Sequence, residues 1–80
     1  MLDDLRTGNK VVGLKQSTKA LENGTVKTLF LAKDAEEKVI NNLKQLSLKN
    51  SVHIVYVESM KQLGKACGIE VGAAVACVLK

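Results

Sequence analysis

The stretch from Val57 to Leu79 reads VESMKQLGKACGIEVGAAVACVL and predicts a strand end, a short helix, a loop and a final strand. Ser59 is placed to cap the helix, and Gln62 three residues later completes a capping box. Gly68 stands where a left-handed C-terminal cap is expected. One face of this helix is apolar and carries Met60, Leu63 and Cys67.

The loop after this helix is unusual because it carries apolar residues. Ile69 and Val71 lie between Gly68 and Gly72, where polar residues would be expected. Apolar side chains at the tip of a loop either fill a core or contact a partner. This stretch alone leaves both interpretations open.

Length and composition limit the class of protein. The chain has 80 residues, which predicts one small domain spanning positions 1–80. Hydrophobic residues make up 46% and aromatic residues only 2%, so the core must be aliphatic. Lys and Arg number 12 against 8 Asp and Glu, and the resulting net charge of +4 favours a polyanionic partner.

The cysteines and the apolar runs exclude several classes of site. Cys67 and Cys77 form no CxxC pair and have apolar neighbours, which predicts reduced, buried thiols, with neither a disulfide nor a metal site. The N-terminus has the pattern of neither a signal peptide nor an anchor, and the longest apolar run, Gly72–Leu79, is too short to span a bilayer. We therefore expect a cytoplasmic protein without membrane attachment, metal or cofactor.

Helix and strand patterns alternate along the whole chain. The predicted strands are Lys10–Leu14, Val26–Ala32, Val52–Val57 and the final stretch ending at Leu79. The predicted helices are a short one over about Asp3–Thr7, one over about Lys15–Glu22, one from Asp34 to near Asn50, and the short one after Ser59. This order predicts an α/β fold in which a partly parallel sheet lies between helices.

Local patterns predict which faces are buried. The continuous apolar run Leu29–Ala32 predicts a strand buried on both faces. Asp34 and Glu37 have the spacing of a capping box for the long helix. The apolar stripe of that helix consists of Val39, Ile40, Leu43 and Leu46. The inner face of the preceding helix is predicted to carry Leu14, Thr18 and Leu21.

The first candidate site begins at Gly13, where a strand is followed directly by a helix. Free N–H groups and the positive dipole end make a helix N-terminus suitable for a phosphate. Ammonium groups suit phosphates and the acceptor edge of guanine, and an amide can pair with base edges. The alternative is an ordinary solvated helix face. The polar side chains on this arc of the helix are Lys15, Gln16 and Lys19.

The second candidate site is the Gly68–Gly72 loop. Its functional interpretation is an apolar platform on which an unstacked nucleic-acid base could rest. The alternative is that Ile69 or Val71 fills the core at the junction of helix and strand. In an alternating α/β layout both candidate sites lie at strand ends and could share one end of the sheet.

Three blocks of sequence carry a family resemblance. They read GLKQSTKAL from Gly13, LAKDA from Leu31, and LGKACGIEVGA from Leu63. In this order they resemble the L-seven-Ae / L-thirty-e ribosomal protein family, whose members bind kink-turn RNA. The resemblance covers nearly the whole chain, and the third block is its most specific part.

The resemblance implies a three-layer α-β-α sandwich with a four-stranded mixed sheet and an RNA-binding edge. Family members place the glycine-led helix N-terminus in the major groove of the kinked RNA, beside sheared G·A pairs, and cover a flipped-out base with an apolar loop. Archaeal members usually carry Asn-Glu where this chain has Lys15-Gln16, which adds positive charge and removes an acceptor carboxylate. The RNA-binding residues implied here are Gly13, Lys15, Gln16, Lys19, Lys33, Asp34, Ile69, Glu70 and Val71.

These observations predict a cytosolic, non-enzymatic, monomeric RNA-binding protein. Its partner would be a kink-turn RNA, either in the ribosome or in a structured messenger leader such as a riboswitch. One alternative is a protein–protein interaction module on the same fold, with Ile69 and Val71 as its docking patch. Another is a small thiol enzyme that uses Cys67.

Overall fold

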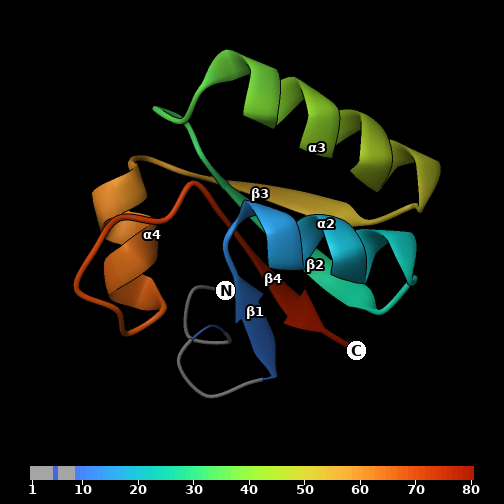
Figure 1. The fold of residues 1–80 in the computed structure, drawn as a ribbon, viewed down its shortest axis with the longest axis horizontal. Coiled ribbons are helices and arrows are strands. Elements are labelled where there is room, and N and C mark those ends of the chain that lie inside the picture. Colours follow the sequence, from blue (N-terminus) through green and yellow to red (C-terminus); the bar gives the residue numbers. More distant parts are fainter. Residues whose placement is uncertain (1–4, 6–8) are drawn as a thin grey trace.

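The computed structural model describes Leu5 and residues 9–80. Its elements, in chain order, are β1 (Lys10–Val12), α2 (Leu14–Glu22), β2 (Val26–Ala32), α3 (Glu37–Lys49), β3 (His53–Val57), α4 (Met60–Ala66) and β4 (Val75–Leu79), as Figure 1 shows. The strands form one sheet in the order β1-β4-β2-β3. The β2–β3 pair is parallel, and β4 runs antiparallel to both of its neighbours. The predicted α/β class with a mixed four-stranded sheet is confirmed.

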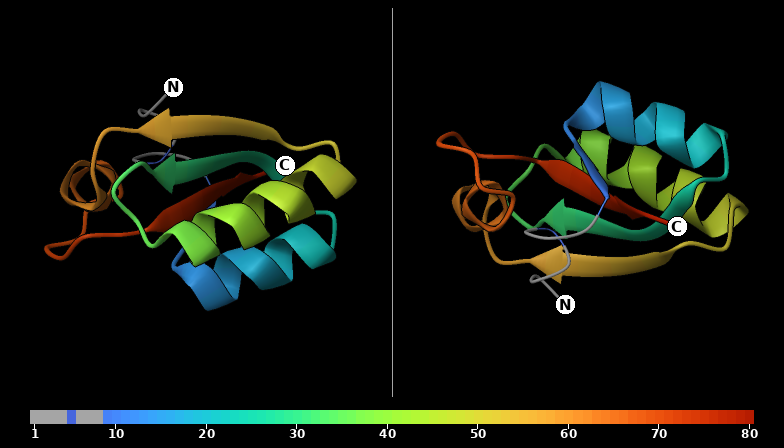
Figure 2. Two further views of the ribbon diagram at one scale, coloured as in Figure 1. Left: turned by 90° about the horizontal axis from the view of Figure 1, so that it is seen from above. Right: turned by 90° about the horizontal axis from the view of Figure 1, so that it is seen from below.

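Helices cover both faces of the sheet. Helices α2 and α3 lie side by side on one face, as both views in Figure 2 show. Helix α4 packs on the opposite face together with Leu5. The core under α2 and α3 contains Leu21, Leu29, Leu31, Leu43 and Cys77. The core under α4 contains Leu5, Phe30, Ala32, Leu63 and Ala76. Neighbouring residues of β2 thus enter opposite cores, which confirms that this strand is buried on both faces.

Strand β1 is shorter than predicted and α2 is turned differently. Gly13 has φ 106 and is the N-cap of α2, so the strand ends at Val12 and Leu14 already belongs to the helix. Leu14 is 45% exposed, which contradicts its predicted inward position. The buried face of α2 consists instead of Ser17, Ala20 and Leu21, and the predicted Thr18 is only partly buried.

The predicted capping box at the start of α3 is wrong. Helix α3 begins at Glu37 after Glu36 as N-cap, and no side chain caps it. The Asp34 carboxylate instead accepts a 2.7 Å hydrogen bond from the backbone N–H of Met60, the first residue of α4. The sheet explains this partner, because the N–H of Lys33 donates to the carbonyl of Val57 over 2.8 Å and so brings the end of β2 beside the start of α4.

Both predicted caps of α4 are found, although of the predicted capping box only the bond to the Ser59 side chain is present among the described residues. Ser59 is the N-cap, and its hydroxyl accepts a 3.1 Å hydrogen bond from the N–H of Gln62. At the other end Gly68 has φ 79, its N–H donates to Lys65, and the N–H of Ile69 donates to Gly64 over 3.1 Å. These two bonds form a Schellman motif. The short helix predicted over Asp3–Thr7 lies outside the described residues apart from Leu5, which is fully buried.

We predict that Asp34→Ala lowers the free energy of unfolding by about 1 kcal/mol, because the N-terminus of α4 loses an acceptor. Chemical denaturation of both proteins measures the difference. Glu36→Ala is the matched control: it removes a carboxylate from the N-cap of α3 that makes no capping hydrogen bond, so stability should hardly change. A costly Glu36→Ala beside a neutral Asp34→Ala would contradict this assignment of caps.

Candidate nucleic-acid interface

The predicted site segments meet at one end of the sheet. The N–H of Gly13 donates to the carbonyl of Val75 over 3.0 Å, and the N–H of Ala32 donates to that of Ala74 over 2.9 Å. Strands β1 and β2 therefore end on either side of the start of β4. We call this region the loop end. It consists of the segments 13–19, 33–34 and 68–72. In Figures 1 and 2 the start of α2 lies toward the side of the 33–34 turn and the 68–72 loop, and the rest of segment 13–19 runs along the helix away from them.

The N-terminus of α2 is open to an acceptor. Gly13 supplies no side chain to cap the helix, and the first turn carries no acidic residue. The side chain of Gln16 lies against this glycine, since a Cβ added to Gly13 would stand 3.0 Å from the Gln16 Oε1 atom. Because no side chain caps its first turn, the helix offers donors and its positive dipole end to an anion.

The three polar side chains predicted on one arc of α2 lie at the surface of the protein. Lys15, Gln16 and Lys19 are all exposed. Lys19 borders two shallow hollows, one shared with Lys15 and the other with Gln16. The exposed Leu14 lines the first hollow, so an apolar side chain joins the polar ones on this surface. Sequence reasoning missed Leu14 because the helical wheel alone did not show how α2 is turned on the sheet.

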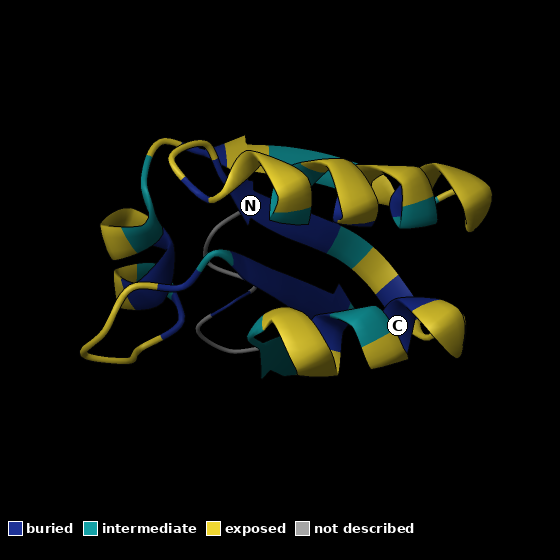
Figure 3. Cartoon of the chain, turned by 45° about the horizontal axis from the view of Figure 1, so that its top comes forward, coloured by how far each residue is buried: buried dark blue, intermediate teal, exposed yellow. Residues whose placement is uncertain are grey.

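The 68–72 loop exposes its apolar side chains. Val71 is 70% exposed and does not fill the core, whereas Ile69 is 36% exposed and belongs to neither core cluster. Figure 3 shows this loop as an exposed tip beside α4. Glu70 between them is exposed as well. The loop thus presents two apolar side chains to a partner.

The two residues of the 33–34 segment have different roles: Lys33 is available at the surface, and Asp34 stabilises the fold. Lys33 pairs with Glu58 at 3.5 Å, but both side chains are more than half exposed, so the pair contributes little to stability. The Lys33 ammonium can therefore exchange this carboxylate for another anion. Asp34, by contrast, holds the N-terminus of α4 and has a structural role that its sequence position did not reveal.

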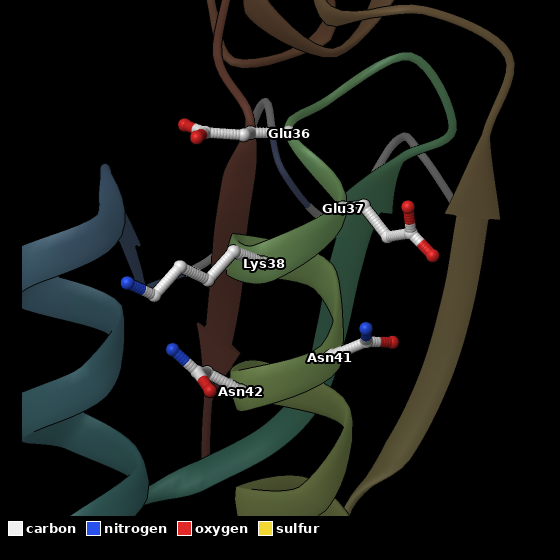
Figure 4. Close-up of a pocket in the computed structure, with 5 residues that line it drawn as sticks. All are labelled: Glu36, Glu37, Lys38, Asn41 and Asn42. Atoms are coloured by element: carbon white, nitrogen blue, oxygen red, sulfur yellow. The ribbon is translucent and has the colours of Figure 1, made fainter.

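A hollow at the start of α3 is no second candidate site. It is lined by Glu36, Glu37, Lys38, Asn41 and Asn42, as Figure 4 shows. Their side chains point to both sides of the helix and do not converge on one point. Across the described residues, no group of three or more His, Cys, Asp or Glu could hold a metal ion. Those residues also include no helix with the length and apolarity needed to cross a membrane.

The two cysteines are free and buried, as predicted. Burial raises the pKa of Cys67, an effect that the Lys10 ammonium partly offsets. Burial also raises the pKa of Cys77, which the Ser17 hydroxyl partly offsets. Neither thiol has the exposure or the lowered pKa of a reactive nucleophile.

We predict that both thiols of the native protein react with a disulfide reagent at pH 8 more slowly than a small-molecule thiol does. The physical reasons are their burial and the raised pKa values. Absorbance of the released chromophore follows the reaction, and the protein in denaturant is the control, in which both thiols should react fully. A fast native phase would contradict the assignment of Cys67 as inert.

Comparison with known proteins gives a consistent picture. A protein named RNA-binding protein BH0128 from Halalkalibacterium halodurans is 49% identical over 70 residues, which cover 88% of this chain and 85% of that protein. RNA-binding protein YbxF from Geobacillus stearothermophilus is 38% identical, covering 95% of this chain and 93% of that protein. The large ribosomal subunit protein eL8 of Halobacterium salinarum is 36% identical, covering 91% of this chain and 62% of that protein.

A solved structure and a family description complete the comparison. The Giardia lamblia 15.5kD RNA binding protein superposes with a TM-score of 0.91 at 24% identity, over 99% of this chain and 70% of that chain, which supports the fold alone. Residues 2–80 match the family described as Ribosomal protein L7Ae/L30e/S12e/Gadd45. The prediction of a non-enzymatic protein agrees with these relatives. By the extent of this match, the chain belongs to the ribosomal protein L7Ae/L30e/S12e/Gadd45 family.

Proposed function

We propose that this protein binds structured RNA and recognises kink-turns. The observation that carries the proposal is the loop end, where an uncapped, cationic helix N-terminus and an exposed apolar loop occur together. The names of the bacterial relatives as RNA-binding proteins support it. The residues proposed to contact RNA are Gly13, Lys15, Gln16, Lys19, Lys33, Ile69, Glu70 and Val71. Asp34 supports them by anchoring α4.

The two surfaces suit a bent RNA better than a regular helix. A regular A-form helix hides its base edges in a deep, narrow major groove that side chains cannot read. A sharp kink opens that groove and expels a base. Lys15 and Gln16 can then reach base edges while Ile69 and Val71 cover the expelled base. A net charge of +4 by itself attracts any nucleic acid and gives no such preference.

The cellular target belongs to the same proposal. Ribosomal RNA and structured messenger leaders are both candidates, and the likeness to a large ribosomal subunit protein supports the first. We propose that the protein acts in the cytoplasm as a monomer, since a single copy presents both surfaces.

A protein–protein interaction module is the second candidate function. The exposure of Ile69 and Val71 favours it, because such a pair also suits an apolar patch on another protein. Salt separates the two candidates. Affinity for RNA falls steeply with salt because phosphate contacts release counterions, whereas apolar docking depends on salt much less.

The decisive experiment compares one RNA in two forms. Affinity is measured for a kink-turn and for the same strand with its G·A pairs changed to Watson–Crick pairs, at matched length and salt. The proposal expects the kink-turn to bind more tightly. Equal affinities would mean that the protein reads only phosphate, and kink-turn recognition would then be abandoned.

We predict that Lys19→Ala weakens kink-turn binding by about 1–3 kcal/mol if the ammonium reaches a base edge. If it meets only a phosphate, the slope of log K against log salt should instead fall by roughly one unit. Titrations at several salt concentrations distinguish the two. Lys44→Ala removes the same charge from an exposed position of α3 and should change neither quantity. Identical behaviour of the two variants would contradict a specific role for Lys19.

We predict that Val71→Ser weakens RNA binding while the melting temperature changes little, because this side chain is 70% exposed. Leu48→Ser is the control, since Leu48 on α3 is equally exposed at 69% and lies outside the loop end. Fluorescence titration and thermal denaturation give the two quantities. A large loss of stability in Val71→Ser with unchanged affinity would show a structural role instead.

A further inference from the structure

Gly64 is a glycine in the interior of α4, and its presence there needs a reason. Glycine in a helix costs roughly 1 kcal/mol relative to alanine. The position is buried, and it faces the loop that follows the helix. A Cβ at Gly64 would collide with the carbonyl oxygen of Val71 and would stand 3.0 Å from the carbonyl carbon of Val71 and 3.1 Å from Cα of Gly72. The backbone of the loop therefore occupies the space that any other side chain would need.

The same loop is fastened to α4 at both ends. The N–H of Ile69 donates to the carbonyl of Gly64 over 3.1 Å. The N–H of Ala73 donates to the carbonyl of Met60 over 3.0 Å. Close to the second bond, a Cβ at Gly72 would lie 3.2 Å from Cβ of Met60. The loop is thus held against one side of the helix by its main chain.

None of the side chains of this loop belongs to either core cluster. Every residue from Gly68 to Gly72 is exposed. The first residue after them to be buried is Ala73. The outward direction of Ile69 and Val71 consequently depends on main-chain contacts with α4, and the closest of these is at Gly64.

We propose that Gly64 is a positioning residue for RNA recognition. Because it has no side chain, the backbone of Val71 and Gly72 can pack against its Cα, and this contact fixes Ile69 and Val71 in their binding conformation before RNA binds. This inference rests on the proposed function. A loop that is ordered in the free protein loses little conformational freedom on binding, so more of the contact energy appears as affinity.

The experiment compares three variants. Gly64→Ala introduces the collision, and Gly72→Ala introduces a milder contact that small shifts can relieve. Leu63→Val is the control, because Leu63 is fully buried in the core under α4 and shortening it should lower stability through the core. Each is measured for its melting temperature, its affinity for a kink-turn and for the Watson–Crick control RNA, and the hydrogen exchange of the Ile69 and Ala73 amides.

We expect Gly64→Ala to lose about tenfold or more in affinity for the kink-turn, as for a lost base contact, with little change for the control RNA. The amides of Ile69 and Ala73 should exchange faster, and Gly72→Ala should show a smaller effect of the same kind. Leu63→Val should melt at a lower temperature and still discriminate between the two RNAs.

Four results would overturn the inference. If Gly64→Ala still discriminates between the two RNAs and its Ile69 and Ala73 amides exchange at the wild-type rate, the contact between the loop backbone and Gly64 is unimportant. Leu63→Val with an equal loss of discrimination would show that general stability is responsible. If Gly64→Ala does not fold, Gly72→Ala carries the test, and unchanged exchange and affinity in that variant would overturn it. If the wild-type protein does not discriminate at all, the proposed function itself fails and the inference with it.

Discussion

The arrangement of the molecule depends on two main-chain hydrogen bonds at the start of β4. The carbonyls of Ala74 and Val75 accept from Ala32 and Gly13, which close β2 and β1. Two consecutive residues thereby place the N-terminus of α2, the turn after β2 and the 68–72 loop at one end of the sheet. Residues separated by more than fifty positions in the chain become parts of one surface because β4 runs between β1 and β2.

The central strands can hold this surface steady because they are buried on both faces. Leu29 and Leu31 face one core, and Phe30 and Ala32 face the other. The residues that would touch a ligand lie outside both cores, on loops and at helix ends. Exposed residues such as Lys15 and Val71 are therefore free to vary without disturbing the packing.

The sequence correctly predicted those structural features that depend on residues close together in the chain. The apolar run of β2 and the Ser59 and Gly68 caps of α4 follow from neighbours a few residues away, and all of them appear in the structure. Asp34 was assigned to the wrong helix because its partner, Met60, lies 26 residues further along the chain. Leu14 was placed inside because periodicity alone does not fix the rotation of a helix on its sheet.

In the candidate site, too, the sequence predicted features that depend on neighbouring residues but not those that depend on distant contacts. The exposed lysines and the apolar loop were identified from the sequence, but Gly64 was not singled out. What Gly64 does could not be derived before the structure, because the atoms it accommodates belong to a loop whose path depends on β4. A glycine inside a helix indicates that another backbone comes close, but it does not indicate which segment of the chain that backbone belongs to.

The hydrogen bonds at the loop end bear on how an RNA would be bound. The apolar loop is hydrogen-bonded to α4, and the N-terminus of α2 is hydrogen-bonded to β4, so both surfaces are anchored to the fold by main-chain bonds. On the proposed function, the RNA must then supply the conformational change. An RNA in equilibrium between straight and bent forms is shifted toward the bent form to the extent that the protein binds that form more tightly. Two surfaces held at a fixed separation supply this preference, since the second contact becomes intramolecular once the first has formed.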